Sequence, residues 1–185
     1  MRADAARNID AVLRTGARLL AADPATSIAT IAAQAGIDRR TVYRRFATRE
    51  ALVAAVFAAK LDSAERVLDA ARLMEAPVAV ALHRYVEGTI PGVRLWPVEV
   101  NRLVGGDEGI EARCRAIRAR MDAFVDRAVA EGFFRADVPP EWIRAMLDHT
   151  VHVAAHHFAD LDAPQCADLV VETLLKGMGG VDHGT

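Results

Sequence analysis

Apolar residues recur every three or four positions along most of this chain, and Gly and Pro residues interrupt the pattern at intervals. This period is typical of amphipathic helices, whereas a half-buried strand needs an alternation of two, which no segment shows. An apolar content of 52% with only 5% aromatics, much of it alanine, also favours helix. The sequence therefore predicts an all-α protein with about nine helices.

Helix-capping residues and helix breakers set the expected boundaries. Ser27, Asp38 and Thr48 have side chains that accept hydrogen bonds from the first turn of a helix, and Gly36 permits a left-handed turn. They divide the N-terminal part into expected helices over 7–22, 28–34, 39–45 and 48–72. Farther along, we expect a helix from Pro77 that ends at Pro91-Gly92, a short segment over 93–104, and helices over 109–131, 137–160 and 162–177.

Several classes of protein are not expected from the composition. No apolar stretch approaches the roughly 18 residues of a membrane-spanning helix, and the first residues lack the apolar core of a signal peptide. Cys114 and Cys166 are too few for a disulfide framework or a cysteine-based zinc site. We expect a cytoplasmic protein without cofactor or membrane contact.

Charge is distributed unevenly along the chain. Residues 1–60 hold ten Lys and Arg against five Asp and Glu, a net charge of +5. The whole chain carries −2, which leaves −7 for residues 61–185. A basic first third beside an acidic remainder indicates that the N-terminal part meets a polyanion.

The stretch "IAAQAGIDRRTVYRRF" (31–46) predicts a helix-turn-helix, in which the second helix enters a DNA major groove. Arg40 and Arg44 are four residues apart on one face, and Val42 and Phe46 share the opposite, apolar face. The helix thus has one face for packing and another for binding.

Arginine suits this task because its planar guanidinium binds guanine or phosphate with two parallel hydrogen bonds. Arg45 and Arg49 are expected nearer the phosphates, Thr41 near a base edge, and Tyr43 against phosphate, sugar or a thymine methyl. Ser27 and the free N–H groups of its helix form a second expected phosphate anchor.

The longer stretch "TSIATIAAQAGIDRRTVYRRFATREALVAAV" (26–56) resembles the DNA-binding signature of TetR-type transcriptional regulators. The resemblance covers about residues 7–60, and "GFFRADVPPEW" (132–142) adds a looser match. It implies a helix-turn-helix DNA-binding domain over 1–47, a connecting helix over 48–72 and an effector-binding, dimerising domain over 73–185. It further implies a homodimer that acts as a repressor and leaves a palindromic operator when a small molecule binds.

Transferred by position, the family's DNA contacts fall on Ser27, Arg39, Thr41, Tyr43 and Arg49. Arg49 stands where lysine is usual, and Arg40 where a small residue is common. Asp38 replaces a frequent serine cap and Thr30 a frequent acidic residue. The expected DNA-binding set, from spacing and resemblance together, is Ser27, Arg39, Arg40, Thr41, Tyr43, Arg44, Arg45 and Arg49.

The C-terminal part offers candidate ligand-binding residues without a specific motif. Aromatic, Met and His side chains between helices are typical of an effector cavity, and equally of plain core. The expected effector set is Tyr85, Trp96, Met121, Phe124, Trp142, Met146, His149 and His152. The last two helices offer an interface for a two-fold dimer, or intramolecular core.

Histidines also recur along "DHTVHVAAHHF" (148–158), where His149, His152 and His156 have the spacing of a helix-borne metal site. The alternatives are a dimer interface or a polar pocket, and we expect no metal. An enzyme or metal carrier built on this helix competes with the regulator, but no nucleophile–base pair, Gly-rich phosphate loop or paired carboxylates accompany the histidines. A DNA-binding protein without an effector remains the other alternative.

Overall fold

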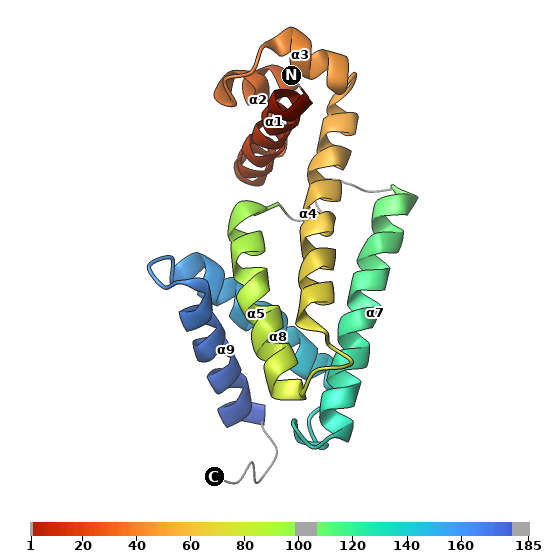
Figure 1. Ribbon diagram of the computed structural model, residues 1–185, viewed down its shortest axis with the longest axis vertical. Coiled ribbons are helices and arrows are strands. Elements are labelled where there is room, and N and C mark those ends of the chain that lie inside the picture. Colours follow the sequence, from red (N-terminus) through yellow and green to blue (C-terminus); the bar gives the residue numbers. More distant parts are fainter. Residues whose placement is uncertain (1, 99–106, 179–185) are drawn as a thin grey trace. The chain divides into compact units, whose positions relative to one another are not determined.

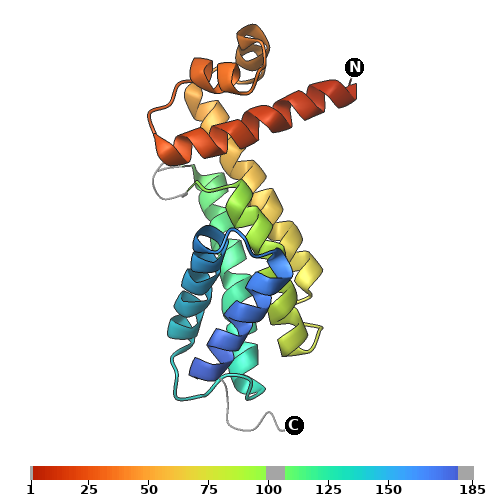
Figure 2. The ribbon, with the colours of Figure 1, turned by 90° about the vertical axis from the view of Figure 1, so that its left-hand side faces the viewer.

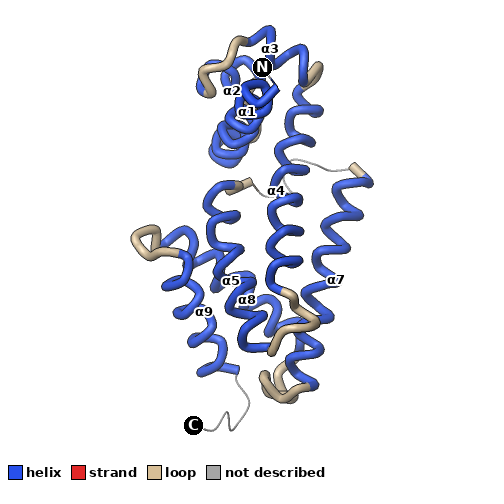
Figure 3. Tube along the Cα trace, in the orientation of Figure 1, coloured by secondary structure: helices blue, strands red, loops and turns tan. Residues whose placement is uncertain are grey.

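The computed structural model describes residues 2–98 and 107–178, and within these ranges every regular element is a helix. The described part of the chain contains eight helices and no strand, and Figures 1 and 3 show how the helices follow one another. The eight helices are α1 (Arg2–Ala22), α2 (Ile28–Gln34), α3 (Arg39–Arg45), α4 (Arg49–Ala71), α5 (Val78–Leu95), α7 (Glu108–Ala130), α8 (Pro140–His157) and α9 (Ala163–Met178). The all-α prediction is confirmed, and the predicted count of nine was approximate.

The chain forms two compact units. The first unit comprises Met1–Asp62 and Leu95–Arg113, and the second comprises Ser63–Arg94 and Cys114–Thr185. Among the described residues, no helix is both long and apolar enough to cross a membrane.

In the first unit, α1, α2 and α3 pack in sequence against one another (Figure 1). Their apolar faces meet: α1 contributes Val12, α2 contributes Ile31 and α3 contributes Val42, each at most 2% exposed. A Cβ added to Gly16 would lie 3.2 Å from Val56, so α1 approaches α4 closely at this point. Packing of these apolar faces against one another, rather than helix propensity, stabilises the helices of this unit.

Side-chain caps begin three of these helices, as the sequence predicted. The Ser27 hydroxyl accepts a hydrogen bond from the Thr30 N–H at 3.1 Å, and the Asp38 carboxylate accepts one from Thr41 at 3.2 Å. Thr48 accepts one from Ala51 at 3.1 Å. Together with Gly36 at φ 67°, these local interactions fix α2, its turn and α3.

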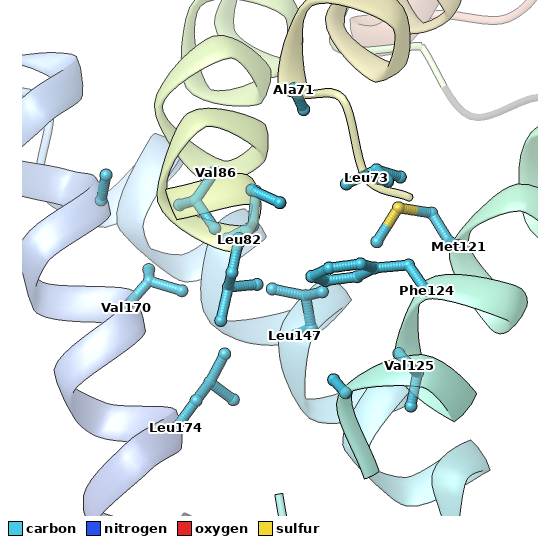
Figure 4. Packing of buried hydrophobic residues seen from close by; sticks show 14 of the residues in the cluster. Ala71, Leu73, Leu82, Val86, Met121, Phe124, Val125, Leu147, Val170 and Leu174 are labelled. Atoms are coloured by element: carbon cyan, nitrogen blue, oxygen red, sulfur yellow. The ribbon is translucent and has the colours of Figure 1, made fainter. Parts of the chain in front are cut away.

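The second unit is built around one hydrophobic core to which α4, α5, α7, α8 and α9 contribute. Figure 4 shows Phe124 of α7 pointing toward Leu82 of α5 and Leu147 of α8, and all three side chains are at most 1% exposed. Figure 2 shows α8 and α9 side by side, and these two helices pack against each other. A core of this kind joins residues that are far apart in the sequence.

One predicted helix end was wrong. The sequence places the end of a helix at Pro91-Gly92, but α5 continues to Leu95 with Pro91 inside it. A proline inside a helix removes one backbone hydrogen bond. In α5, side-chain hydrogen bonds from the turn after Pro91 offset this loss. Arg94 donates hydrogen bonds to the carbonyl oxygens of Ala155 at 3.1 Å and Phe158 at 3.0 Å, which holds the last turn in place.

Other boundaries also differ from the prediction. α1 begins at Arg2 rather than at residue 7, because the first turn carries helix-favouring residues without an apolar stripe to mark it. α8 ends at His157, before the predicted 160. Of the short segment expected over 93–104, residues 99–104 lie outside the described residues.

Candidate nucleic-acid interface

Helix α3 has one buried and one exposed face. Val42 is 2% exposed and Phe46, its C-cap, is 5% exposed, so these two side chains dock the helix into the first unit. The arginine side chains at 39, 40, 44 and 45 are all exposed. The predicted division of the helix into a packing face and a basic face is therefore present.

All eight predicted DNA-binding residues lie in the first unit, on α2, α3 or the first turn of α4 or at their caps. Six are exposed and two, Thr41 and Arg49, are half-buried. The exposed six are Ser27, Arg39, Arg40, Tyr43, Arg44 and Arg45.

Two arginines of α3 stack on aromatic rings. The Arg39 guanidinium carbon lies 5.1 Å from the Tyr43 ring centroid, and its Nη2 is 3.5 Å from the Tyr43 hydroxyl. The Arg45 guanidinium lies 5.5 Å from the Phe46 ring. Stacking restricts long side chains before any ligand arrives, which lowers the entropy cost of binding. The four-residue spacing of Arg39 and Tyr43 is the sequence signal that could have predicted their pairing.

Arg49 has a different environment from the α3 arginines. Its Nε donates to the carbonyl oxygen of Thr26 at 3.2 Å, and its Nη2 donates to that of Pro24. These contacts cross from the start of α4 to the loop between α1 and α2. No local sequence pattern indicates these contacts, because the partners are backbone atoms more than twenty positions away.

The departures from the family pattern at the caps have visible structural roles. Thr30 forms a hydroxyl–hydroxyl hydrogen bond with Ser27 at 2.9 Å, in place of the carboxylate that closes a capping box. Asp38 caps α3, so its charge also interacts favourably with the helix dipole.

The predicted effector residues are distributed over both units. Met121 and Phe124 have no exposed surface and belong to the core of the second unit, against which Tyr85 and Met146 pack. Trp96 is also buried, but it belongs to the first unit.

The other three members of that set face outward from α8. Trp142 is 56% exposed, and His149 and His152 are exposed as well. The structure thus brings together four of the eight residues, around the core of the second unit.

Tyr85 has a strongly shifted titration. Burial, and secondly the negative charge of Asp148, raise the pKa of its phenol to about 12, against smaller lowering effects of Arg144 and Thr89. Its hydroxyl therefore stays protonated at neutral pH and can donate a hydrogen bond.

A groove of about 490 Å³ lies between α7 and the start of α8. Its charged residues are two arginines and four carboxylates: Arg118, Asp122, Asp126, Glu141, Arg144 and Asp148. Arg144 crosses it, donating to Asp122 at 2.9 Å and Asp148 at 3.1 Å. None of the predicted effector residues lines this groove.

The histidines of α8 lie along its outer face. The His152 and His156 rings are 4.4 Å apart, and the His149 Nδ1 is 2.7 Å from the carbonyl oxygen of Ala145. His83 of α5 forms a hydrogen bond with Asp168 of α9 at 2.9 Å. Within the described ranges, no three His, Cys, Asp or Glu side chains come together as a metal site.

The exposed basic helix, docked by an apolar face after a glycine turn, defines the first unit as a helix-turn-helix DNA-binding domain. Comparison with protein families agrees, since residues 12–56 match the family of bacterial regulatory proteins of the tetR type. No curated protein matched the chain in a sequence comparison.

Solved structures share the fold over nearly the whole chain. The TetR-like regulator LfrR from Mycobacterium smegmatis, in complex with proflavine, is 24% identical with a TM-score of 0.70, covering 92% of this chain and 96% of that one. The ketosteroid regulator KstR2 of Mycobacterium tuberculosis is 20% identical with a TM-score of 0.77, covering 92% and 94%. AibR, in complex with isovaleryl coenzyme A and operator DNA, is 21% identical with a TM-score of 0.71, covering 90% and 97%.

Residues 12–56 thus resemble the DNA-binding part of tetR-type regulators, and the described chain shares its fold with solved structures of such regulators.

Proposed function

We propose that the protein is a homodimeric, non-enzymatic repressor that binds a palindromic operator and leaves it when a small molecule binds in the C-terminal domain. The observation that carries this proposal is the exposed basic face of α3, held by buried Val42 and Phe46. In this proposal the predicted domains at 1–47, 48–72 and 73–185 bind DNA, connect, and bind the effector, respectively. Its predicted location is the cytoplasm.

Every predicted DNA-binding residue except Arg49 contacts DNA directly in this proposal. Arg40 and Arg44 read base edges, because their fork geometry fits guanine O6 and N7. Ser27, Arg39, Tyr43 and Arg45 contact phosphate or sugar, and Thr41 approaches a base. Phosphate contacts set the register of α3, and base contacts supply the sequence preference.

The effector would bind around Tyr85, Met121, Phe124 and Met146, with Trp96, Trp142, His149 and His152 as further contacts. LfrR with proflavine and AibR with isovaleryl coenzyme A support a small-molecule ligand in a protein of this fold. Because Met121 and Phe124 have no exposed surface, such a ligand must favour a conformation with a rearranged core. Movement of α4 would then change the spacing of the two recognition helices.

Exposed apolar side chains on α8 and α9 support the homodimer. Trp142, Val153 and Leu169 are each at least 40% exposed on these helices. A second copy related by a two-fold axis would bury them, since such an interface brings the same surface patch of both copies together.

The experiment that tests this function is selection of bound duplexes from a random library, followed by affinity measurements at increasing salt. The proposal predicts enrichment of a palindrome, whose log affinity falls steeply with log salt concentration. No enrichment, or a sequence without two-fold symmetry, would contradict it. Addition of candidate ligands to the selected complex then tests release.

A further inference from the structure

Arg49, the first residue of α4, directs its guanidinium at the backbone of the loop between α1 and α2. Its Nε donates to the Thr26 carbonyl oxygen at 3.2 Å, and its Nη2 donates to the Pro24 carbonyl oxygen. These two donors share one edge of a rigid, planar group, so they fit two neighbouring acceptors together. The contact fastens the start of α4 to a segment 23 residues earlier.

The loop that Arg49 holds is tightly folded and leads directly into α2. The Asp23 carboxylate accepts from the Ala25 N–H at 2.9 Å, and the Thr26 hydroxyl donates to the Asp23 carbonyl at 2.8 Å. Thr26 is only 9% exposed, and Ser27, the next residue, caps α2. The position of Ser27 therefore depends on a loop whose two central carbonyls are bound by Arg49.

We propose that Arg49 is a positioning residue for DNA binding: it holds the loop 23–26, and through it the Ser27 side chain, in place instead of neutralising a phosphate itself. The inference rests on the proposed function, and it replaces the phosphate contact that the sequence predicts for Arg49. A lysine here would keep the charge but lose the fork, because an ammonium group is a compact point charge.

The decisive variant is Arg49→Lys, which keeps the charge while removing the two-carbonyl geometry. We expect its affinity for the selected duplex to fall on the order of tenfold, as for the loss of one charge-assisted hydrogen bond. Its plot of log affinity against log salt stays parallel to that of the wild type, because no phosphate contact is lost. Wild-type affinity in Arg49→Lys would overturn the proposal, since any cation would then suffice.

Arg45→Ala is the matched control, because Arg45 is exposed on α3 at the predicted phosphate side. Loss of a phosphate contact reduces the salt slope by about 0.9 for each contact. We expect the slope of log affinity against log salt to fall by this amount in Arg45→Ala, and by much less in Arg49→Ala. Equal flattening in both alanine variants would show that Arg49 contacts phosphate.

Amide hydrogen exchange of the full-length protein without DNA tests the positioning directly. We expect the amides of residues 25–30 to exchange faster in Arg49→Lys than in the wild type, with unchanged exchange in α5, α7, α8 and α9. Unchanged exchange at 25–30 would overturn the inference even if the wild type binds its operator. Conversely, a wild type that binds no duplex refutes the proposed function and leaves this measurement decisive for Arg49.

Discussion

The α2–α3 segment and the core of the second unit differ in what holds them together. In α2 and α3, caps at Ser27 and Asp38 and the turn at Gly36 act within four residues of their partners. In the second unit, Phe124 packs against side chains from α5 and α8, and Arg94 bonds to carbonyls more than sixty positions away. The comparison teaches that the bounds of α2 and α3 depend mainly on local contacts, whereas the core of the second unit depends on contacts between distant segments.

Among single substitutions, we expect the largest loss of stability from one in the core of the second unit. Phe124→Ala removes a ring with no exposed surface, so we expect the free energy of unfolding to fall by about 3–5 kcal/mol. Denaturant unfolding followed by circular dichroism measures the change. Met74→Ala is the control, because Met74 is 54% exposed and its truncation should change stability by less than about 0.5 kcal/mol. Equal effects would mean that Phe124 is not part of a packed core.

Tyr85 provides a pH test of the same core. Its pKa is raised to about 12 by burial, so in the folded state the phenol stays neutral after the unfolded chain has ionised. Its contribution to stability is complete below pH 10 and is lost as the pH rises from 10 to 12, by about 2–3 kcal/mol. Tyr85→Phe should lack this part of the alkaline loss, measured by unfolding at each pH. An identical pH dependence in both proteins would contradict the burial of the phenol.

On the local side of the comparison, Arg44→Ala should impair DNA binding while leaving the fold intact. Arg44 is exposed, and we expect the preference for its base to weaken by roughly 1–3 kcal/mol. Competition binding with duplexes altered at single positions measures that preference. Arg84→Ala removes an exposed arginine of α5 and should leave binding unchanged. A similar loss in the Arg84 variant would point to net charge rather than to α3.

The smallest expected effect concerns the cap of α3. Asp38→Ala should cost about 1 kcal/mol, because the Thr41 N–H loses its acceptor. Asp38→Asn keeps a capping oxygen, so it should retain most of the stability and bind DNA more tightly by removing a negative charge near phosphate. Thermal unfolding and duplex affinity separate the two effects. If the alanine and asparagine variants are equally stable, the cap does not stabilise α3.

Local signals also explain which features could be predicted from the sequence. The bounds of α2 and α3 follow from a cap, a glycine and an apolar spacing that all lie within a few residues. The same reasoning placed a helix end at Pro91, because the hydrogen bonds of Arg94 to Ala155 and Phe158 leave no local trace.

For the candidate site, spacing could predict which side chains of α3 are exposed and which are buried. It could not predict that Arg49 binds the carbonyls of Pro24 and Thr26, or that Trp96 and Tyr85 belong to different units. Both features depend on contacts between segments that are far apart in the sequence. The spacing of apolar residues carries no information about such contacts.

The most direct test of the central claim is a parallel duplex selection with the wild type and Arg40→Ala. If the exposed face of α3 reads DNA, both proteins should enrich the same palindrome, with one symmetric pair of positions no longer specified in the variant. An unchanged motif in Arg40→Ala would show that Arg40 does not read sequence. No enrichment by the wild type would contradict the account that this basic helix binds an operator.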